Sequence, residues 1–254
     1  MKINNKVMNL FLDKIDIETG KTGTVPLENF LISFEDGMES FVANKGTQVA
    51  ALVKVSKEGF TKFEKHEAIG IKNLKTLQNF VGRFSDEIDF TIKNNVLEMK
   101  SASKKIVMSL IEKDYASPPG IVLSEIIYHV PEFQLETKFL KDILDDTEIY
   151  SNVSVVFECK DGKLSVTVQE TNSPDHIVTR TDIPFLKGHN FKTEFQKENL
   201  KPILKRLTEP SVRVKLQTDY PLIIREIGKQ FTTLYLVAPI VHEETKEEPK
   251  EEVE

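Results

Sequence analysis

The sequence predicts an α+β fold in which one unit occurs four times. Each unit begins with a short amphipathic helix and continues with an alternating strand, a tight turn and a second strand. The strand–turn–strand parts occupy residues 30–41, 88–99, 153–166 and 212–224. Apolar and polar residues alternate along them, as in half-buried antiparallel strands. Asp-Gly or Asn-Asn pairs at three of the turns accept the positive φ that hairpins need.

A helix is expected before each hairpin. The four apolar patterns with helical spacing cover about 5–16, 72–84, 137–145 and 194–207. Asn4 or Asn5 provides an N-cap for the first helix. Pro202 lies within the fourth range, which predicts either a kink or a later helix start. Helices and strands do not alternate as in parallel βαβ units, and this favours antiparallel sheets.

The chain divides into two similar halves. Residues 112–120 contain two prolines and a glycine and block regular structure, so they indicate a connector. Residues 19–26 read as an irregular segment. We therefore expect four parts, each half carrying two helices packed on antiparallel sheets. They are an N-terminal domain (1–112), an interdomain connector (113–129), a C-terminal domain (130–241) and an acidic tail (242–254).

Composition restricts the class of protein. The chain has 254 residues, 39% hydrophobic and 29% charged, which fits a folded water-soluble protein. No apolar stretch approaches the roughly 20 residues that cross a bilayer, and the first residues lack the apolar core of a signal peptide. The one cysteine, Cys159, cannot form an intrachain disulfide, which suits a reducing compartment. We therefore expect an intracellular protein with no membrane partner.

Charge is unevenly distributed along the chain. The formal net charge is −6, which taken alone argues against a nucleic-acid partner. Residues 242–254 contain seven Glu and two Lys and so account for −5 of it. This tail has no aromatic residue and is expected to be disordered. The rest of the chain is close to neutral, and its lysines can form a local basic surface.

Each expected helix places basic or polar side chains opposite its apolar stripe. In the second helix, Leu74, Leu77 and Val81 form the stripe. One such helix would indicate only a solvated face, whereas four equivalent helices indicate sequence-independent attraction to DNA phosphates. No motif for reading bases is present. The expected DNA-facing residues are Lys6, Lys14, Lys72, Lys75, Asn79, Arg83, Lys138, Lys141, Lys197, Lys201, Lys205 and Arg206.

The sequence contains no signature of catalysis. No phosphate-binding loop, dinucleotide fingerprint, nucleophile elbow or zinc-protease motif occurs. The five histidines lack the paired spacing of a metal site. Cys159 falls in an expected strand and is interpreted as a buried structural residue. We therefore expect no catalytic residue, metal or cofactor.

Three parts of the sequence carry a family resemblance. The first is Ser-Lys-Glu-Gly-Phe at 56–60, followed by Ala-Ile-Gly-Ile at 68–71 and a helix start. The second is Phe-Glu-Cys-Lys-Asp-Gly at 157–162. The third and most specific combines Tyr-Pro-Leu-Ile-Ile at 220–224 with Leu-Tyr-Leu-Val-Ala-Pro-Ile at 234–240. With the four helix–hairpin units, this ordered set resembles the DNA sliding clamps of the proliferating cell nuclear antigen (PCNA) family, archaeal or viral in type.

The resemblance implies a ring of six similar domains, built as a homotrimer of two-domain chains. Helices would line the hole and sheets would form the outer layer, with strand pairing between subunits covering the sheet edges. Such a ring is a non-enzymatic processivity factor that encircles double-stranded DNA. The implied partners are a DNA polymerase, a clamp loader of the replication factor C type, a flap endonuclease and a DNA ligase. The implied place is on DNA inside an archaeal or virus-infected cell, or in a eukaryotic nucleus.

The resemblance also implies a pocket under the connector that takes a short motif with aliphatic and aromatic residues. For Pro221 and Pro239, plain edge-strand prolines are the alternative interpretation. Carried onto this sequence, the pocket residues are Thr47, Gln48, Val49, Ile127, Val130, Pro131, Pro221, Leu236, Val237, Ala238 and Pro239.

Two other interpretations stay open. One is a heteromeric or checkpoint-type clamp subunit that acts mainly as a protein–protein adaptor. The other is an unrelated α+β enzyme or structural protein. Particle mass separates the homotrimeric clamp from the heteromeric subunit. A homotrimer has about three times the 29.0 kDa chain mass, while a persistent monomer favours the heteromer.

Overall fold

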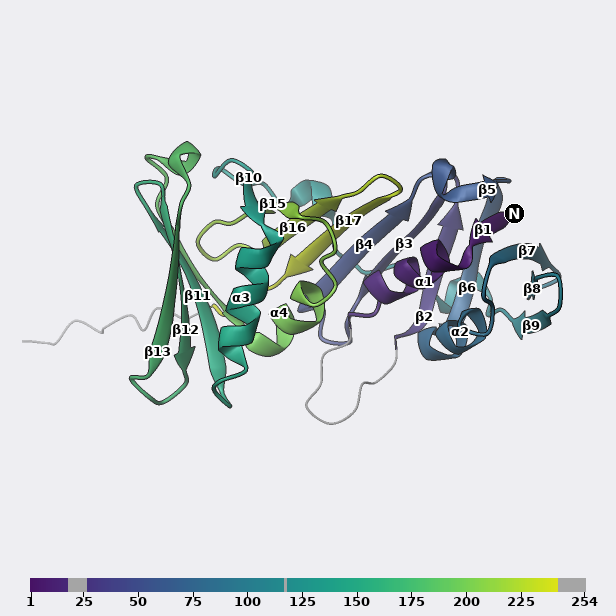
Figure 1. Ribbon diagram of the computed structural model, residues 1–254, viewed down its shortest axis with the longest axis horizontal. Coiled ribbons are helices and arrows are strands. Elements are labelled where there is room, and N and C mark those ends of the chain that lie inside the picture. Colours follow the sequence, from purple (N-terminus) through teal and green to yellow (C-terminus); the bar gives the residue numbers. More distant parts are fainter. Residues whose placement is uncertain (18–26, 117, 242–254) are drawn as a thin grey trace, which may run out of the picture.

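The computed structural model describes residues 1–17, 27–116 and 118–241 (Figure 1). The expected acidic tail, the irregular segment from 19 to 26 and Ser117 of the connector therefore lie outside the described residues. The fold is α+β, as predicted, with helices packed on antiparallel sheets. Figure 1 shows α1 to α4 on one side of the central sheet, with a smaller sheet at each end of the molecule.

The elements of the two halves follow the same plan. The first half contains β1 (Lys2–Asn4), α1 (Asn5–Lys14), β2 (Glu28–Phe34), β3 (Met38–Ala43), β4 (Val49–Val55), η1 (Lys57–Gly59), β5 (Phe60–Lys62), β6 (His66–Asn73), α2 (Leu74–Val81), β7 (Glu87–Lys93), β8 (Val96–Lys100) and β9 (Lys105–Ser109). The second contains β10 (Phe133–Glu136), α3 (Thr137–Thr147), β11 (Val153–Lys160), β12 (Lys163–Glu170), β13 (His176–Asp182), η4 (Pro184–Leu186), β14 (Phe191–Gln196), α4 (Lys197–Leu204), β15 (Ser211–Lys215), β16 (Leu222–Ile227) and β17 (Phe231–Val237). Two short 3₁₀ turns, η2 (Lys113–Tyr115) and η3 (Leu123–Glu125), lie between the halves.

Three antiparallel sheets organise these strands. An eight-stranded sheet has the order β10-β15-β16-β17-β4-β3-β2-β6 and therefore crosses from one half to the other. Its two parts join where β17 pairs with β4 over their full length, from Phe231↔Val55 to Val237↔Val49. A five-stranded sheet, β5-β1-β7-β8-β9, belongs to the first half, and a four-stranded sheet, β13-β12-β11-β14, to the second.

The helices lie where the sequence predicts them, with different ends. Asn4 caps α1 by accepting a hydrogen bond from the Lys6 backbone N–H. Asn73 caps α2 in the same way by accepting from Thr76. The fourth helix was predicted to begin near 194 but begins at Lys197, because the residues before it form β14 and pair with β11. The helix thus begins later than 194, but Pro202 does not mark its start, because it lies inside α4.

All four predicted hairpins form. Asn94 and Asn95 in the β7–β8 turn have φ values of 52° and 57°. Gly37 between β2 and β3 has a φ of 105°, and a Cβ there would lie 2.1 Å from the carbonyl oxygen of Val55. Only glycine fits that position. Cys159 is fully buried in β11, as predicted, and burial raises the pKa of its thiol, which keeps it protonated and unreactive.

Candidate nucleic-acid and partner interfaces

Eight of the predicted DNA-facing residues are exposed to solvent. In the described part of the chain, no carboxylate lies within 4.0 Å of the amino group of Lys6, Lys72, Lys75, Lys138, Lys141 or Lys205. Lys104, which the sequence analysis missed, donates from its amino group to the Arg83 carbonyl oxygen at 2.6 Å and so lies beside α2. The exposed set is Lys6, Lys72, Lys75, Asn79, Arg83, Lys138, Lys141 and Lys205.

Lys14 and Lys197 are not part of an exposed surface, so their assignment was wrong. Lys14 is 1% exposed and forms an ion pair with Glu226 of β16. Lys197 is 9% exposed, and its ammonium group donates to the carbonyl oxygen of Thr147 at the end of α3. Helical spacing predicted the correct face of each helix, but other elements cover these two positions.

Lys201 and Arg206 are only half-exposed and already hold partners. The Lys201 ammonium lies 2.6 Å from Glu148, and this hydrogen bond lowers the pKa of the Glu148 carboxyl. The Arg206 guanidinium is bonded to Asp16 and to the end of α1. Lys197 and Lys201 of α4, and Arg206 after it, are therefore already paired with other groups of the chain.

The free positive charge is concentrated around α2. This helix carries no acidic residue, and exposed Lys72, Lys75 and Arg83 lie in it or next to it. On α3, by contrast, exposed Asp142 and Asp145 accompany the lysines. The basic surface is thus stronger in the first half than in the second.

The other face of the central sheet carries an apolar cluster that the connector covers. We call it the outer-face cluster. The large buried cluster between the helices and the sheets, which includes Phe11, Leu77 and Val237, is the helix-side core. Period-two alternation places the sheet residues of the outer-face cluster on the opposite face from this core. Residues of the connector pack against them from outside. The sheet contributes Phe41, Ala43, Ala50, Ile223, Leu234 and Leu236, and the connector contributes Ile121, Leu123, Ile126 and Tyr128.

Tyr128 fastens the connector to the second half of the chain. Its hydroxyl donates to the carbonyl oxygen of Pro221, and its ring lies 5.5 Å from that of Tyr220. The ammonium of Lys215 lies 5.6 Å from the Tyr128 ring centroid, within range of a cation–π contact. Burial raises the pKa of the Tyr128 hydroxyl, so it remains a hydrogen-bond donor at any physiological pH.

The predicted pocket residues are partly brought together. Leu236 belongs to the outer-face cluster. The carbonyl oxygen of Pro221 accepts a hydrogen bond from Tyr128, which is another residue of this cluster. The backbone N–H of Ala238 donates to Gln48 at 2.7 Å, so the loop carrying Thr47 and Gln48 lies beside the C-terminal strand. Pro131 and Pro239 are half-buried, and their assignment stays a prediction.

Three pocket assignments were wrong. Val49 and Val237 are 0% exposed and belong to the helix-side core, because neighbouring strand residues point to opposite faces. Val130 is also buried in that core, whereas Ile127 is 64% exposed on the connector and its assignment stays a prediction. Alternation from Leu236 was the signal for Leu234. The cluster residues missed were Phe41, Ala43, Ala50, Ile121, Leu123, Ile126, Tyr128, Ile223 and Leu234.

Other kinds of site leave no trace in the part of the chain that is described. No group of three or more His, Cys, Asp or Glu side chains comes together there as a candidate metal centre. Among the described residues, no helix is long and apolar enough to cross a membrane.

Solved structures share this fold over nearly the whole chain. No family model and no curated protein matches the sequence. A. fulgidus PCNA, solved with the C-terminal region of FEN-1, has a TM-score of 0.78 at 16% identity, covering 96% of this chain and 98% of that one. Entamoeba histolytica PCNA gives 0.73 at 13%, covering 94% and 98%. The PCNA2–PCNA3 complex of Sulfolobus tokodaii gives 0.71 at 14%, covering 94% and 99%. The chain therefore has the fold of the PCNA-type DNA sliding clamps.

Proposed function

We propose that the chain is a subunit of a DNA sliding clamp, a non-enzymatic processivity factor that encircles duplex DNA inside the cell without reading its sequence. The observation that carries this proposal is the agreement of fold with PCNA over 94–96% of the chain. A basic surface without base-reading motifs fits sequence-independent contact with phosphates. The domain division at a connector of residues 113–129 is part of the same proposal.

The free sheet edges support assembly with other copies. The edge strand β9 lies at one end of the molecule and the edge strand β13 at the other (Figure 1). Pairing β9 of one copy with β13 of the next would merge a five-stranded and a four-stranded sheet and remove both edges. Repeated three times, such a head-to-tail contact would close a homotrimeric ring.

The other edge of the four-stranded sheet is already occupied. The backbone N–H of Lys192 donates to the Thr218 hydroxyl, and the N–H of Ile240 donates to the Glu194 carbonyl oxygen at 2.7 Å. On β9, Val107 is 53% exposed. These features favour β9 and β13 as the joining strands.

Replacing Lys72 and Lys75 with glutamate is expected to weaken DNA association while leaving the fold and assembly intact. Both side chains are exposed beside α2, so reversal affects the charge facing DNA rather than packing. Each lost phosphate contact should reduce the slope of log affinity against log salt by about 0.9. Salt-dependent DNA retention and polymerase processivity measure the effect.

The matched control is Lys62→Glu with Lys65→Glu, which changes the net charge equally. These two lysines are exposed near β5 and form ion pairs with Glu64 and Glu35. The control is expected to behave like the original protein. Equal retention and processivity in both double variants would contradict the assigned DNA face.

We further propose that partner enzymes dock on the outer-face cluster through a short apolar and aromatic motif. The classes expected are a polymerase, a clamp loader of the replication factor C type, a flap endonuclease and a ligase. The half-buried apolar residues under the connector support this, and the A. fulgidus PCNA structure contains the C-terminal region of FEN-1.

An Ile126→Asp substitution is expected to weaken binding of such motif peptides by tenfold or more, about 1.4 kcal/mol. Ile126 packs on the cluster, whereas Ile149 is 65% exposed and follows α3 on the helix side of the molecule. Ile149→Asp is therefore the matched control and should bind normally. Peptide titration by calorimetry compares the two, and equal affinities would place the docking surface elsewhere.

A heteromeric ring is the second candidate. It is favoured by the similarity to the PCNA2–PCNA3 complex of Sulfolobus tokodaii, which pairs two different clamp chains. In that arrangement the chain would be a heteromeric or checkpoint-type subunit that acts mainly as an adaptor. Light scattering distinguishes the two, because this chain alone would then remain a 29.0 kDa monomer.

A further inference from the structure

A buried ionic network joins the two halves of the chain on the helix side of the central sheet. Lys14, the last residue of α1, extends into the second half and forms an ion pair with Glu226 of β16. Both side chains are only 2% exposed, and no other ion pair in the described residues has both partners so deeply buried. The Lys14 ammonium also donates to the Arg206 carbonyl oxygen at 3.2 Å and to the Thr208 hydroxyl at 3.3 Å.

Glu226 is held from the other side by the loop that follows α4. One carboxylate oxygen accepts the backbone N–H of Thr208 at 2.5 Å and that of Glu209 at 2.7 Å. The other oxygen accepts from Lys14. The carboxylate is therefore satisfied only when α1, the loop after α4 and β16 are all in place.

A second set of contacts, which we call the second arm, is made by a residue of the second half to the first half. The Arg206 guanidinium, from the second half, donates to the Asp13 carbonyl oxygen at 2.6 Å and pairs with Asp16 at 3.1 Å. It thereby binds the C-terminal end of α1, where a cation is favoured by the helix dipole. The same group donates to the Pro202 carbonyl oxygen of α4 at 2.7 Å.

We infer that Lys14, Glu226 and Arg206 form an interdomain clasp that fixes the angle between the two halves of the chain. Strand pairing and apolar packing alone tolerate twisting, whereas buried charges impose one geometry because any other leaves a charge unpaired. The clasp crosses the boundary in both directions, so it resists rotation as well as separation. These residues act by positioning and not by contact with DNA.

The angle matters because it decides whether repeated copies close. A head-to-tail contact gives a ring when the rotation per subunit fits, and an open helical assembly when it does not. In a ring of six similar units, the bend between the halves of one chain must be about 60°. The inference thus rests on the proposed clamp function, although the clasp itself can be tested on the isolated chain.

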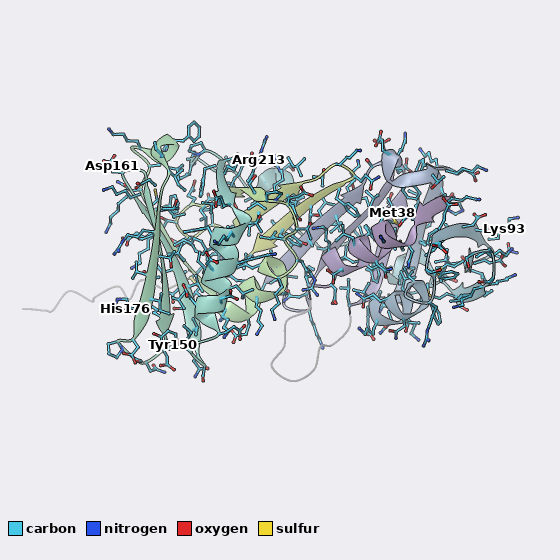
Figure 2. The ribbon with its side chains drawn as sticks, in the orientation of Figure 1. Met38, Lys93, Tyr150, Asp161, His176 and Arg213 are labelled. Atoms are coloured by element: carbon cyan, nitrogen blue, oxygen red, sulfur yellow. The ribbon has the colours of Figure 1, made fainter. Side chains whose placement is uncertain are left out.

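The test measures the distance between the two halves directly. Spin labels are attached at two exposed positions, Lys93→Cys and Lys160→Cys. Figure 2 marks Lys93 and Asp161, the residue after Lys160, at opposite ends of the molecule. Labelled chains are diluted with unlabelled ones, so each distance comes from within one chain. Buried Cys159 is left in place.

Two clasp variants are compared with one control. Lys14→Met with Glu226→Leu replaces the buried pair by apolar side chains of similar size, and Arg206→Met removes the second arm without leaving a buried charge. Lys197→Met is the control, since Lys197 is buried and its partners among the described residues are Thr147, Glu148 and Tyr150 of its own half.

Both clasp variants are expected to fold, to widen the interspin distance distribution roughly twofold, and to assemble into a mixture of open oligomers in place of one closed species. The control should match the original protein in both readouts. An unchanged distance distribution in both clasp variants overturns the inference. If the original chain does not form a ring, the proposed function fails, while the distance measurement still decides the clasp.

Discussion

A Val107→Asp variant is expected to remain folded and to lose self-assembly. Val107 lies in the middle of the edge strand β9 and is 53% exposed, so the aspartate costs little in the isolated chain. Pairing of β9 with β13 of another copy would place that charge between two neighbouring strands and partly desolvate it, at a cost of a few kcal/mol. Each boundary should weaken on the order of a hundredfold or more. Sedimentation equilibrium across a concentration series measures this shift to monomer.

The control is Val122→Asp, which places the same charge at a valine that is 51% exposed in the connector. Because Val122 lies outside any sheet edge, this variant should assemble normally. An oligomer of unchanged stability in Val107→Asp would exclude β9 as a joining strand.

Removing one partner of the buried pair is expected to produce the largest loss of stability. Glu226→Leu leaves the Lys14 ammonium buried without its carboxylate, which should lower the free energy of unfolding by about 3–5 kcal/mol. Adding Lys14→Met removes that stranded charge and should recover part of the loss, since the backbone N–H groups of Thr208 and Glu209 still lack their acceptor. Chemical denaturation of the single and double variants measures both values.

An exposed ion pair provides the contrast. Lys57→Met breaks the surface contact with Asp36 and should change the stability little, because solvent screens both groups. A Glu226→Leu variant as stable as Lys57→Met would mean that the buried pair contributes nothing across the interdomain boundary.

The same pair predicts a dependence on pH. Burial raises the pKa of Glu226, but hydrogen bonds from Lys14, Glu209 and Thr208 outweigh it, so the folded-state pKa lies below the ordinary 4.5. A carboxyl with a lowered pKa stabilises the fold above the unfolded value and loses that contribution as pH falls through the folded one. The Lys14→Met/Glu226→Leu double variant should therefore lose less stability than the original protein below pH 4.5.

Local patterns in the sequence were sufficient to predict the four helix–hairpin units. Asn94-Asn95 and Asp161-Gly162 adopt the positive φ values that their residue types favour. The apolar stripe of α2, formed by Leu74, Leu77 and Val81, is buried as its spacing predicts. These features depend on neighbours only a few residues apart, so periodicity identifies them.

The basic surface was predicted less well because burial depends on distant residues. Lys14 occupies a regular position on a helix face, but its partner Glu226 is 212 residues away in the chain. Arg206 and Asp16 meet across a similar separation. The wrong assignment of Val237 to the partner pocket had a local cause. Strand alternation places Leu236 in the outer-face cluster and its neighbour Val237 in the helix-side core.

Electron microscopy of the purified full chain tests the central claim most directly. The account predicts ring-shaped particles of about three times 29.0 kDa, with six similar lobes around a hole that duplex DNA can pass through. Compact particles without a hole, at any concentration at which the protein assembles, would contradict it.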